Sequence, residues 1–163
     1  MCLNYESAAR YQTAKKDIVC YKILKCVDDE WLTPFRGTPI DNDVVWGRVE
    51  QFPFNTDYKP ILHECIPSLW GNTYRTCIGE GFVHACASQN GAENVLKEMK
   101  SLEYGYLRGH FVEPKISLAL FKCVIPKGTL YVTGRDDYGN TGYACKKIKF
   151  VEKIKELEIN KEL

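Results

Sequence analysis

The sequence has no long apolar run, almost no net charge and few histidines. No stretch approaches the roughly 18 consecutive apolar residues of a membrane-spanning helix, and the first residues lack the basic start and apolar core of a secretory signal. We therefore expect a cytoplasmic protein without a membrane partner. The formal charge of +1 over 163 residues gives no overall field that would attract nucleic acid, so we expect no nucleic-acid partner either.

The eight cysteines follow neither a metal-binding nor a disulfide pattern. No Cys-x-x-Cys pair occurs, and His63, His84 and His110 show no spacing typical of a metal pair. A chain of this length buries enough surface to fold without disulfides. We therefore expect reduced and mostly buried thiols, and the sequence predicts no metal site and no cofactor.

The sequence also lacks the usual phosphate-binding fingerprints. Gly79-Glu80-Gly81 matches neither a dinucleotide fingerprint nor a P-loop, because no Gly-Lys-Ser or Gly-Lys-Thr opens a helix. A nucleophilic pair of Cys86 and His84 is disfavoured, since residues two apart on a strand lie about 7 Å apart. The sequence therefore predicts no catalytic residues.

Runs of β-branched and aromatic residues predict strands near both ends of the chain. Apolar residues at helical spacing predict one helix at about 91–103. The expected strands lie at 17–24, at 31–33 as its hairpin partner, at 118–125 and 130–132 around a turn at Pro126-Lys127-Gly128, and at 144–150.

These elements predict a single α+β domain over residues 1–163, with a bent or split, mostly antiparallel sheet and one main helix packed on it. Residues 1–16 are expected to form a polar N-terminal arm, and 151–163 a charged tail or short helix, because Val151, Ile154 and Leu157 approach helical spacing. Residues 40–72 show no readable pattern.

Five residues are candidates for a ligand site. Lys22 interrupts an apolar strand, where it would be either a solvated guard of a sheet edge or an anion ligand on the sheet face. His84 follows two glycines and stands among small residues, so it would either face a cleft or be a structural histidine. Tyr131 is a polar aromatic residue on a predicted strand. Phe35 and Arg36 lie in a proline-flanked loop, where they would stack on a base and grip a phosphate, or simply face solvent.

Three segments resemble ADP-ribosyltransferase-like domains: the strand with Tyr21-Lys22, the segment 81–86 before the helix, and Ile125-Pro126-Lys127-Gly128-Thr129. The resemblance covers about half of the chain. It implies a split sheet that binds NAD. The sequence departs from the family at its catalytic positions, because His84-Ala85-Cys86 replaces Ser-Thr-Ser and no glutamate stands near Tyr143 to Lys147. The stretch from Lys15 to Lys22 also resembles small proteins of bacteriophages and of Bacteroidales mobile elements.

Aromatic residues are abundant, with ten Tyr, seven Phe and three Trp, and no charged catalytic cluster accompanies them. This combination favours a non-catalytic binding module for a nucleotide-like small molecule, such as a phage-type anti-defence protein that sequesters a signalling nucleotide. One alternative is an NAD-consuming, ADP-ribosyltransferase-like enzyme that uses Glu80 or another acid. The other is a protein-interaction or inhibitor domain, which would bind a host protein or assemble as a homo-oligomer.

Overall fold

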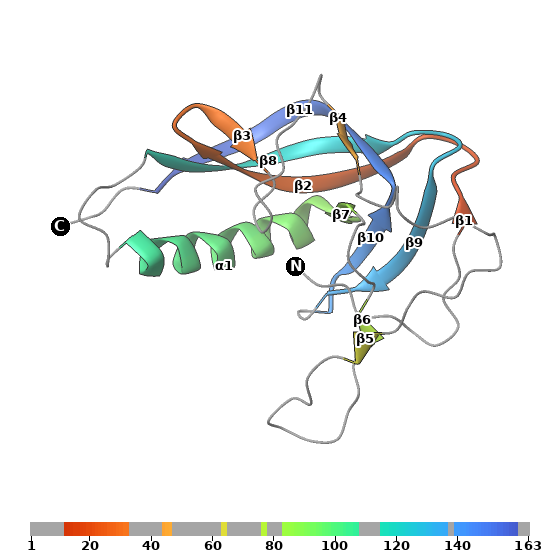
Figure 1. Cartoon of the computed structure of the whole chain (residues 1–163), viewed down its shortest axis with the longest axis horizontal. Coiled ribbons are helices and arrows are strands. Elements are labelled where there is room, and N and C mark those ends of the chain that lie inside the picture. The colour runs from red at the N-terminus through yellow and green to blue at the C-terminus, as the bar shows by residue number, and fades with distance from the viewer. Residues whose placement is uncertain are drawn as a thin grey trace.

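The computed structural model describes residues 12–32, 44–46, 63–64, 76–77, 83–107, 115–136 and 139–159. In chain order its elements are β1 (Gln12–Thr13), β2 (Ile18–Val27), β3 (Glu30–Leu32), β4 (Val44–Trp46), β5 (His63–Glu64), β6 (Thr76–Cys77), β7 (Val83–Cys86), α1 (Gln89–Leu107), β8 (Ile116–Ile125), β9 (Leu130–Arg135), β10 (Thr141–Cys145) and β11 (Lys147–Glu158) (Figure 1).

Antiparallel strands dominate the described residues. Nine strands form one sheet in the order β1-β9-β10-β7-β2-β8-β11-β4, with β3 paired to β2 beside this path, and β5 pairs with β6 separately. The α+β class expected from the sequence was therefore wrong. The structure is an open, mostly antiparallel sheet accompanied by one described helix, because stretches that showed no strand pattern also pair into the sheet.

The centre of the sheet is the long pair of β2 and β8. The two strands stay in register over their whole length, from Ile18 opposite Ile125 to Val27 opposite Ile116. Both are rich in β-branched and other apolar residues, which pack well on a pleated surface with both faces covered.

Helix α1 runs along β2 and β8 on one face of the sheet, which we call the helix face (Figure 1). Ser88 begins the helix, since its side-chain oxygen accepts a hydrogen bond from the Gly91 amide at 3.1 Å. The buried stripe of α1 packs against apolar side chains of β8 and β2, and the cluster includes Ala92, Val95, Leu96, Met99, Ile116, Leu118, Leu120 and Ile23.

The opposite face, which we call the inner face, is concave. Strands β10 and β11 are separated only by Lys146, although β7, β2 and β8 lie between them in the sheet order. One residue spans only about 3.5 Å, so the sheet must curl strongly to join these strands. Side chains of β2, β7, β8, β10 and β11 accordingly meet in one buried cluster on the inner face, namely Cys20, Leu24, Val83, Ala85, Cys123, Ile125, Cys145, Ile148 and Phe150.

Two tight turns hold the strands in register. At the predicted turn, the Thr129 amide donates to the Pro126 carbonyl at 3.0 Å, and Gly128 takes a φ of 84°, which a type II turn requires at that position. The turn between β2 and β3 consists of Asp28 and Asp29, with φ of 49° and 70°. Two such residues between paired strands form the type I′ geometry that matches strand twist, although glycine or asparagine adopts it more readily than aspartate.

Both ends of the described chain differ from the expected arm and tail. Gln12–Thr13 form β1, which pairs with β9. Residues 147–158 form one long strand, β11, so the short helix expected after residue 150 does not form. The predicted first strand and its hairpin partner are present as β2 and β3.

Candidate functional site

Lys22 lies at the centre of the sheet, on the inner face. It follows Cys20 by two positions and precedes Leu24 by two, and both of these residues belong to the inner-face cluster. Its Cα partner on β8 is Phe121, which packs against the same cluster. Because β2 is a central strand and Lys22 is only partly exposed, the interpretation of Lys22 as a solvated edge guard was wrong.

Lys22 stands where the sheet splits. Strand β7 pairs with β2 only at Tyr21 opposite Cys86, and β3 pairs with β2 from Lys25 onward. Between these two pairings the Lys22 Nζ donates a hydrogen bond to the His84 carbonyl at 2.6 Å. The lysine side chain thus supplies a donor to a strand carbonyl at the point where pairing between β2 and β7 stops.

Protonated thiols lie near the Lys22 amine: Cys20, Cys123 and Cys145 share its face of the sheet, and Cys86 lies on the helix face of β7. Burial raises the pKa of Cys20 to about 12 and that of Cys86 to about 11, and it also raises the pKa values of Cys123 and Cys145. The same loss of solvent lowers the pKa of Lys22, and the thiols oppose this effect only in part. These thiols therefore provide no negative charge at neutral pH to balance a lysine ammonium.

No family model, curated protein or solved structure matches this chain.

Two tyrosines lie on the inner face beside the thiols. Tyr131 and Tyr143 both pack against the inner-face cluster, and their rings meet edge to face with centroids 5.9 Å apart. The Tyr131 hydroxyl donates to Gln12 Oε1 at 3.2 Å, which ties β1 to β9. Burial raises the pKa of Tyr143, and the neighbouring Tyr131 and Cys20 add to the effect. The Tyr143 hydroxyl therefore stays protonated at neutral pH and can donate a hydrogen bond, and the oxygens of both hydroxyls can accept one.

The structure brings only part of the predicted site together. Lys22 and Tyr131 share the inner face. His84 alternates with Val83 and Ala85, which face the inner cluster, so its imidazole shares the helix face with Cys86. His84 contributes its backbone carbonyl to Lys22 rather than its imidazole to a common pocket.

Other predicted elements of the site lie outside the described residues. These are Phe35 and Arg36, together with Glu80 and the turns at Gly79 and Gly81. Gly128 is described, and its turn joins β8 to β9. The arginine and phenylalanine thus stay predictions.

Sequence reasoning missed Tyr143 and the grouping of the thiols. Tyr143 is recognisable only once β10 is known, because a single polar aromatic residue between Gly142 and Ala144 carries little pattern. The thiols are spread over 126 positions between Cys20 and Cys145, and only the curl of the sheet gathers them. Lys22 was found because a charge within an apolar strand is itself a signal.

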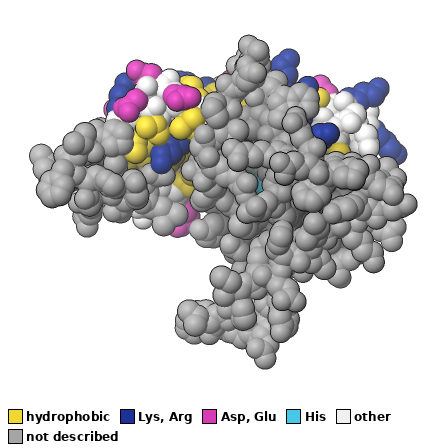
Figure 2. Space-filling view, viewed as in Figure 1, with side chains coloured by type: hydrophobic (Ala, Val, Ile, Leu, Met, Phe, Trp, Pro, Cys, Tyr) yellow, Lys and Arg dark blue, Asp and Glu magenta, His cyan; other side chains and the backbone are white. Residues whose placement is uncertain are grey.

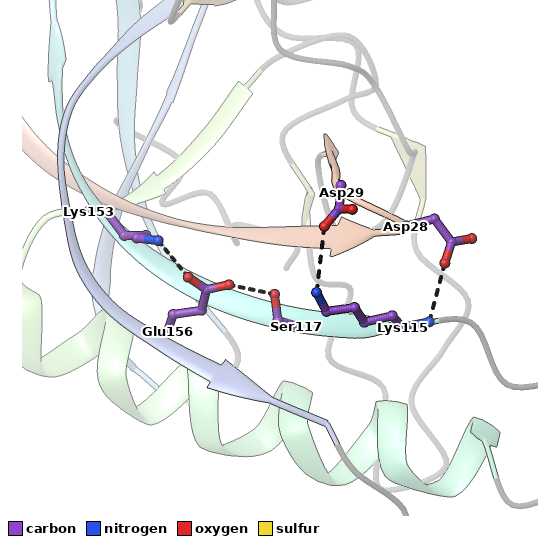
Figure 3. Close-up of polar contacts among 6 residues, drawn as sticks. All are labelled: Asp28, Asp29, Lys115, Ser117, Lys153 and Glu156. Atoms are coloured by element: carbon purple, nitrogen blue, oxygen red, sulfur yellow. Dashed lines mark hydrogen bonds and ion pairs between the residues drawn. The ribbon is translucent and has the colours of Figure 1, made fainter.

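A second polar group lies where β2 ends, β8 begins and β11 ends (Figure 3). The Ser117 hydroxyl donates to Glu156 at 2.8 Å, and Lys153 contacts the other oxygen of that carboxylate. Lys153 and Ser117 together lower the pKa of Glu156. Figure 2 shows side chains of both charge signs interspersed at this end. The ion pairs are solvent-exposed, so they form a surface network that contributes little to stability.

No group of three or more metal-ligating side chains comes together within the parts of the chain that the structure describes. Within those same parts, no helix has the length and apolar character needed to cross a membrane.

Proposed function

We propose that this protein binds a small anionic ligand of the nucleotide class on its inner face, with the Lys22 amine paired to the ligand's anionic group. One observation carries the proposal. An amine stands in a thiol-lined apolar face, and its hydrogen-bond partner among the described residues is a neutral carbonyl.

A lysine in such surroundings has two ways to avoid an unbalanced charge. It gives up its proton, as its lowered pKa indicates, or it acquires an anion. In the described part of the chain no carboxylate forms a hydrogen bond or ion pair with Lys22. An anion supplied by a ligand would therefore meet a cation that the described residues leave without a counter-charge.

The neighbouring side chains suit a ring attached to that anion. Tyr131 and Tyr143 are half-buried, so each keeps part of its surface exposed next to the thiol cluster. Aromatic faces and thiols favour a flat, polarisable base, and the tyrosine hydroxyls offer hydrogen bonds at its edge. A nucleoside monophosphate combines these two features. The binding would take place in the cytosol, where thiols stay reduced.

Calorimetric titration with adenosine, AMP and NAD tests the proposal. We expect AMP to bind more tightly than adenosine, because only AMP carries the anion. Lys22→Met should weaken AMP binding about ten- to a hundredfold, as loss of a charge-assisted hydrogen bond predicts, while adenosine binding changes little. Lys122→Met is the matched control, since Lys122 comes from β8 but shares the helix face.

Three outcomes would contradict the proposal. Equal AMP affinity in the parent and in Lys22→Met would show that Lys22 does not pair with the anionic group of AMP. Sustained release of nicotinamide from NAD would show that the protein is an NAD-consuming enzyme and not a binding module. A stable complex with a host protein, combined with no response to any nucleotide, would favour a protein-interaction domain.

A further inference from the structure

We propose that the helix face carries a docking surface for an acidic segment of a partner protein, at the end of the sheet that α1 leaves uncovered. This surface lies on the opposite side of the sheet from the Lys22 amine. The proposal therefore does not depend on nucleotide binding at the inner face.

The helix face is covered unevenly. Helix α1 packs over the half of the β2-β8 pair that contains Ile23 and Ile116. Further across the same face, on β10, Ala144 is paired with His84 and is fully buried. Val19 lies in the other half of β2 and keeps 45% of its surface exposed. The helix face is therefore open to solvent where β2 begins.

Two valines form the centre of this open surface. Val19 and Val124 are Cα partners on β2 and β8, and each adjoins a cysteine of the inner-face cluster, so both share the helix face. Val124 is half-buried, so the pair keeps apolar area in contact with water. Covering that area with apolar side chains of a partner would lower the free energy of the complex.

Lysines border the valine pair. Lys149 is the Cα partner of Val124 on β11, and its side chain is exposed. Lys147 shares the helix face with Lys149, because Ile148 between them belongs to the inner-face cluster. Lys122 precedes Val124 by two positions on β8 and is half-exposed. We call these three lysines and the two valines the valine-lysine surface.

Two carboxylates offset part of this positive charge. Glu152 lies opposite Lys122 on β11, and Asp17 accepts a hydrogen bond from the Lys127 amide at 2.8 Å beside the open end. Lys127 is itself exposed there and adds a further positive charge. In the described part of the chain, lysines therefore outnumber carboxylates around the valines. A partner that brings carboxylates to this border would be complementary in charge.

The apolar centre and the basic border together favour a protein segment. A phosphate backbone would match the lysines but would offer no apolar groups to the valines, whereas an acidic protein segment offers both carboxylates and apolar side chains. The surface is small and the charges are exposed, so we expect a transient, salt-sensitive complex.

Fluorescence anisotropy tests this inference with two fluorescein-labelled peptides of about twelve residues, long enough for about three helical turns. The acidic peptide carries leucine on one helical face and glutamate along both borders of that face. The control peptide has lysine in place of every glutamate. We expect the acidic peptide to bind, with an affinity that falls as salt rises from about 50 to about 300 mM, and the basic peptide not to bind.

Two variants locate the binding. Lys149→Glu should weaken binding of the acidic peptide about fivefold, because an attraction becomes a repulsion at an exposed position. Val19→Ser should also weaken it, by loss of apolar contact. Lys97→Glu makes the same change of charge on the exposed side of α1 and should leave the affinity unchanged.

Several results would overturn the proposal. These are no binding of the acidic peptide, equal effects of Lys149→Glu and Lys97→Glu, or unchanged affinity in Val19→Ser. Tighter, Lys149-dependent binding of oligothymidylate or of phosphatidylserine vesicles would show a different occupant and would also overturn it. No nucleotide is present when the peptides are titrated, so the result is independent of the calorimetric test with AMP.

Discussion

Replacing Lys22 by methionine should change how the stability of the protein depends on pH. Methionine has nearly the same length and no amine, so the variant removes the ionisable group with little loss of volume. The absolute change in stability is not decisive. Loss of the donor to the His84 carbonyl lowers the free energy of unfolding by about 1–3 kcal/mol. The variant also no longer carries the cost of burying an amine, which raises the free energy of unfolding.

The slope with pH is decisive, because its sign follows from the lowered pKa. In the unfolded chain Lys22 has its ordinary pKa of 10.5, and in the folded protein its pKa is lower. Between the two values the unfolded state binds more protons, so the free energy of unfolding contributed by Lys22 rises with pH. The rise reaches up to about 1.4 kcal/mol per pH unit in that window, and the contribution is constant below and above it.

Urea unfolding of the parent and of Lys22→Met, at intervals from about pH 6 to about pH 10, measures this difference. The buried thiols have raised pKa values and destabilise both proteins above their unfolded pKa of 9.0. Because Lys22 lowers the pKa values of these thiols, the comparison rests on the points below that pH. We expect the parent to gain stability relative to the variant as pH rises. Lys122→Met serves as the control and should follow the parent curve. A parent-to-variant difference that stays constant over the whole range would refute the assignment of Lys22 as a desolvated amine.

Two further predictions concern the turns that set strand register. Asp29→Gly should stabilise the protein by about 1 kcal/mol in urea unfolding, because the φ of 70° is strained for aspartate. The ion pair that this variant loses, with Lys115, is solvent-exposed and contributes little. A clear loss of stability would show that the ion pair matters more than the strain. Gly128→Ala should destabilise by about 1–2 kcal/mol, because a Cβ there meets open space but the φ of 84° remains unfavourable; an unchanged midpoint would mean that the turn relaxes without cost.

The long central strands and the helix were predictable because their signals are local. β2 and β8 are runs of β-branched and other apolar residues, and α1 carries its buried residues at helical spacing. The turn at Gly128 was predictable for the same reason, since glycine supplies the positive φ that a type II turn needs.

The end of the chain was misread because two bulges alter the period of β11. The register between β11 and β8 shifts between Phe150 and Glu152, and again between Lys153 and Lys155. Each extra residue interrupts the alternation of faces, so Ile154 and Leu157 both reach the helix-face cluster at a spacing of three. A spacing of three in the sequence is typical of a helix, and only the pairing with β8 reveals the strand.

The environment of Lys22 was not predictable from its own segment. Whether a lysine in a strand lies at a solvated sheet edge or in the interior depends on which strands lie beside it. Strand order is set by distant parts of the chain. Here β7 and β8 flank β2, and the curl from β10 to β11 closes thiols around the amine. The fold class failed for a related reason, because short strands such as β1 and β4 are too brief to carry a pattern.

Lys22 is by this account an interior amine, and an anionic ligand favours its protonated form. NMR of protein with ¹³C-labelled lysine, assigned with Lys22→Arg, follows the Lys22 Cε signal as pH is changed, with and without AMP. The account predicts that Lys22 titrates below its ordinary pKa of 10.5 in the free protein, and that AMP moves this titration to higher pH. A Lys22 signal that titrates at its ordinary value and does not respond to AMP would contradict it.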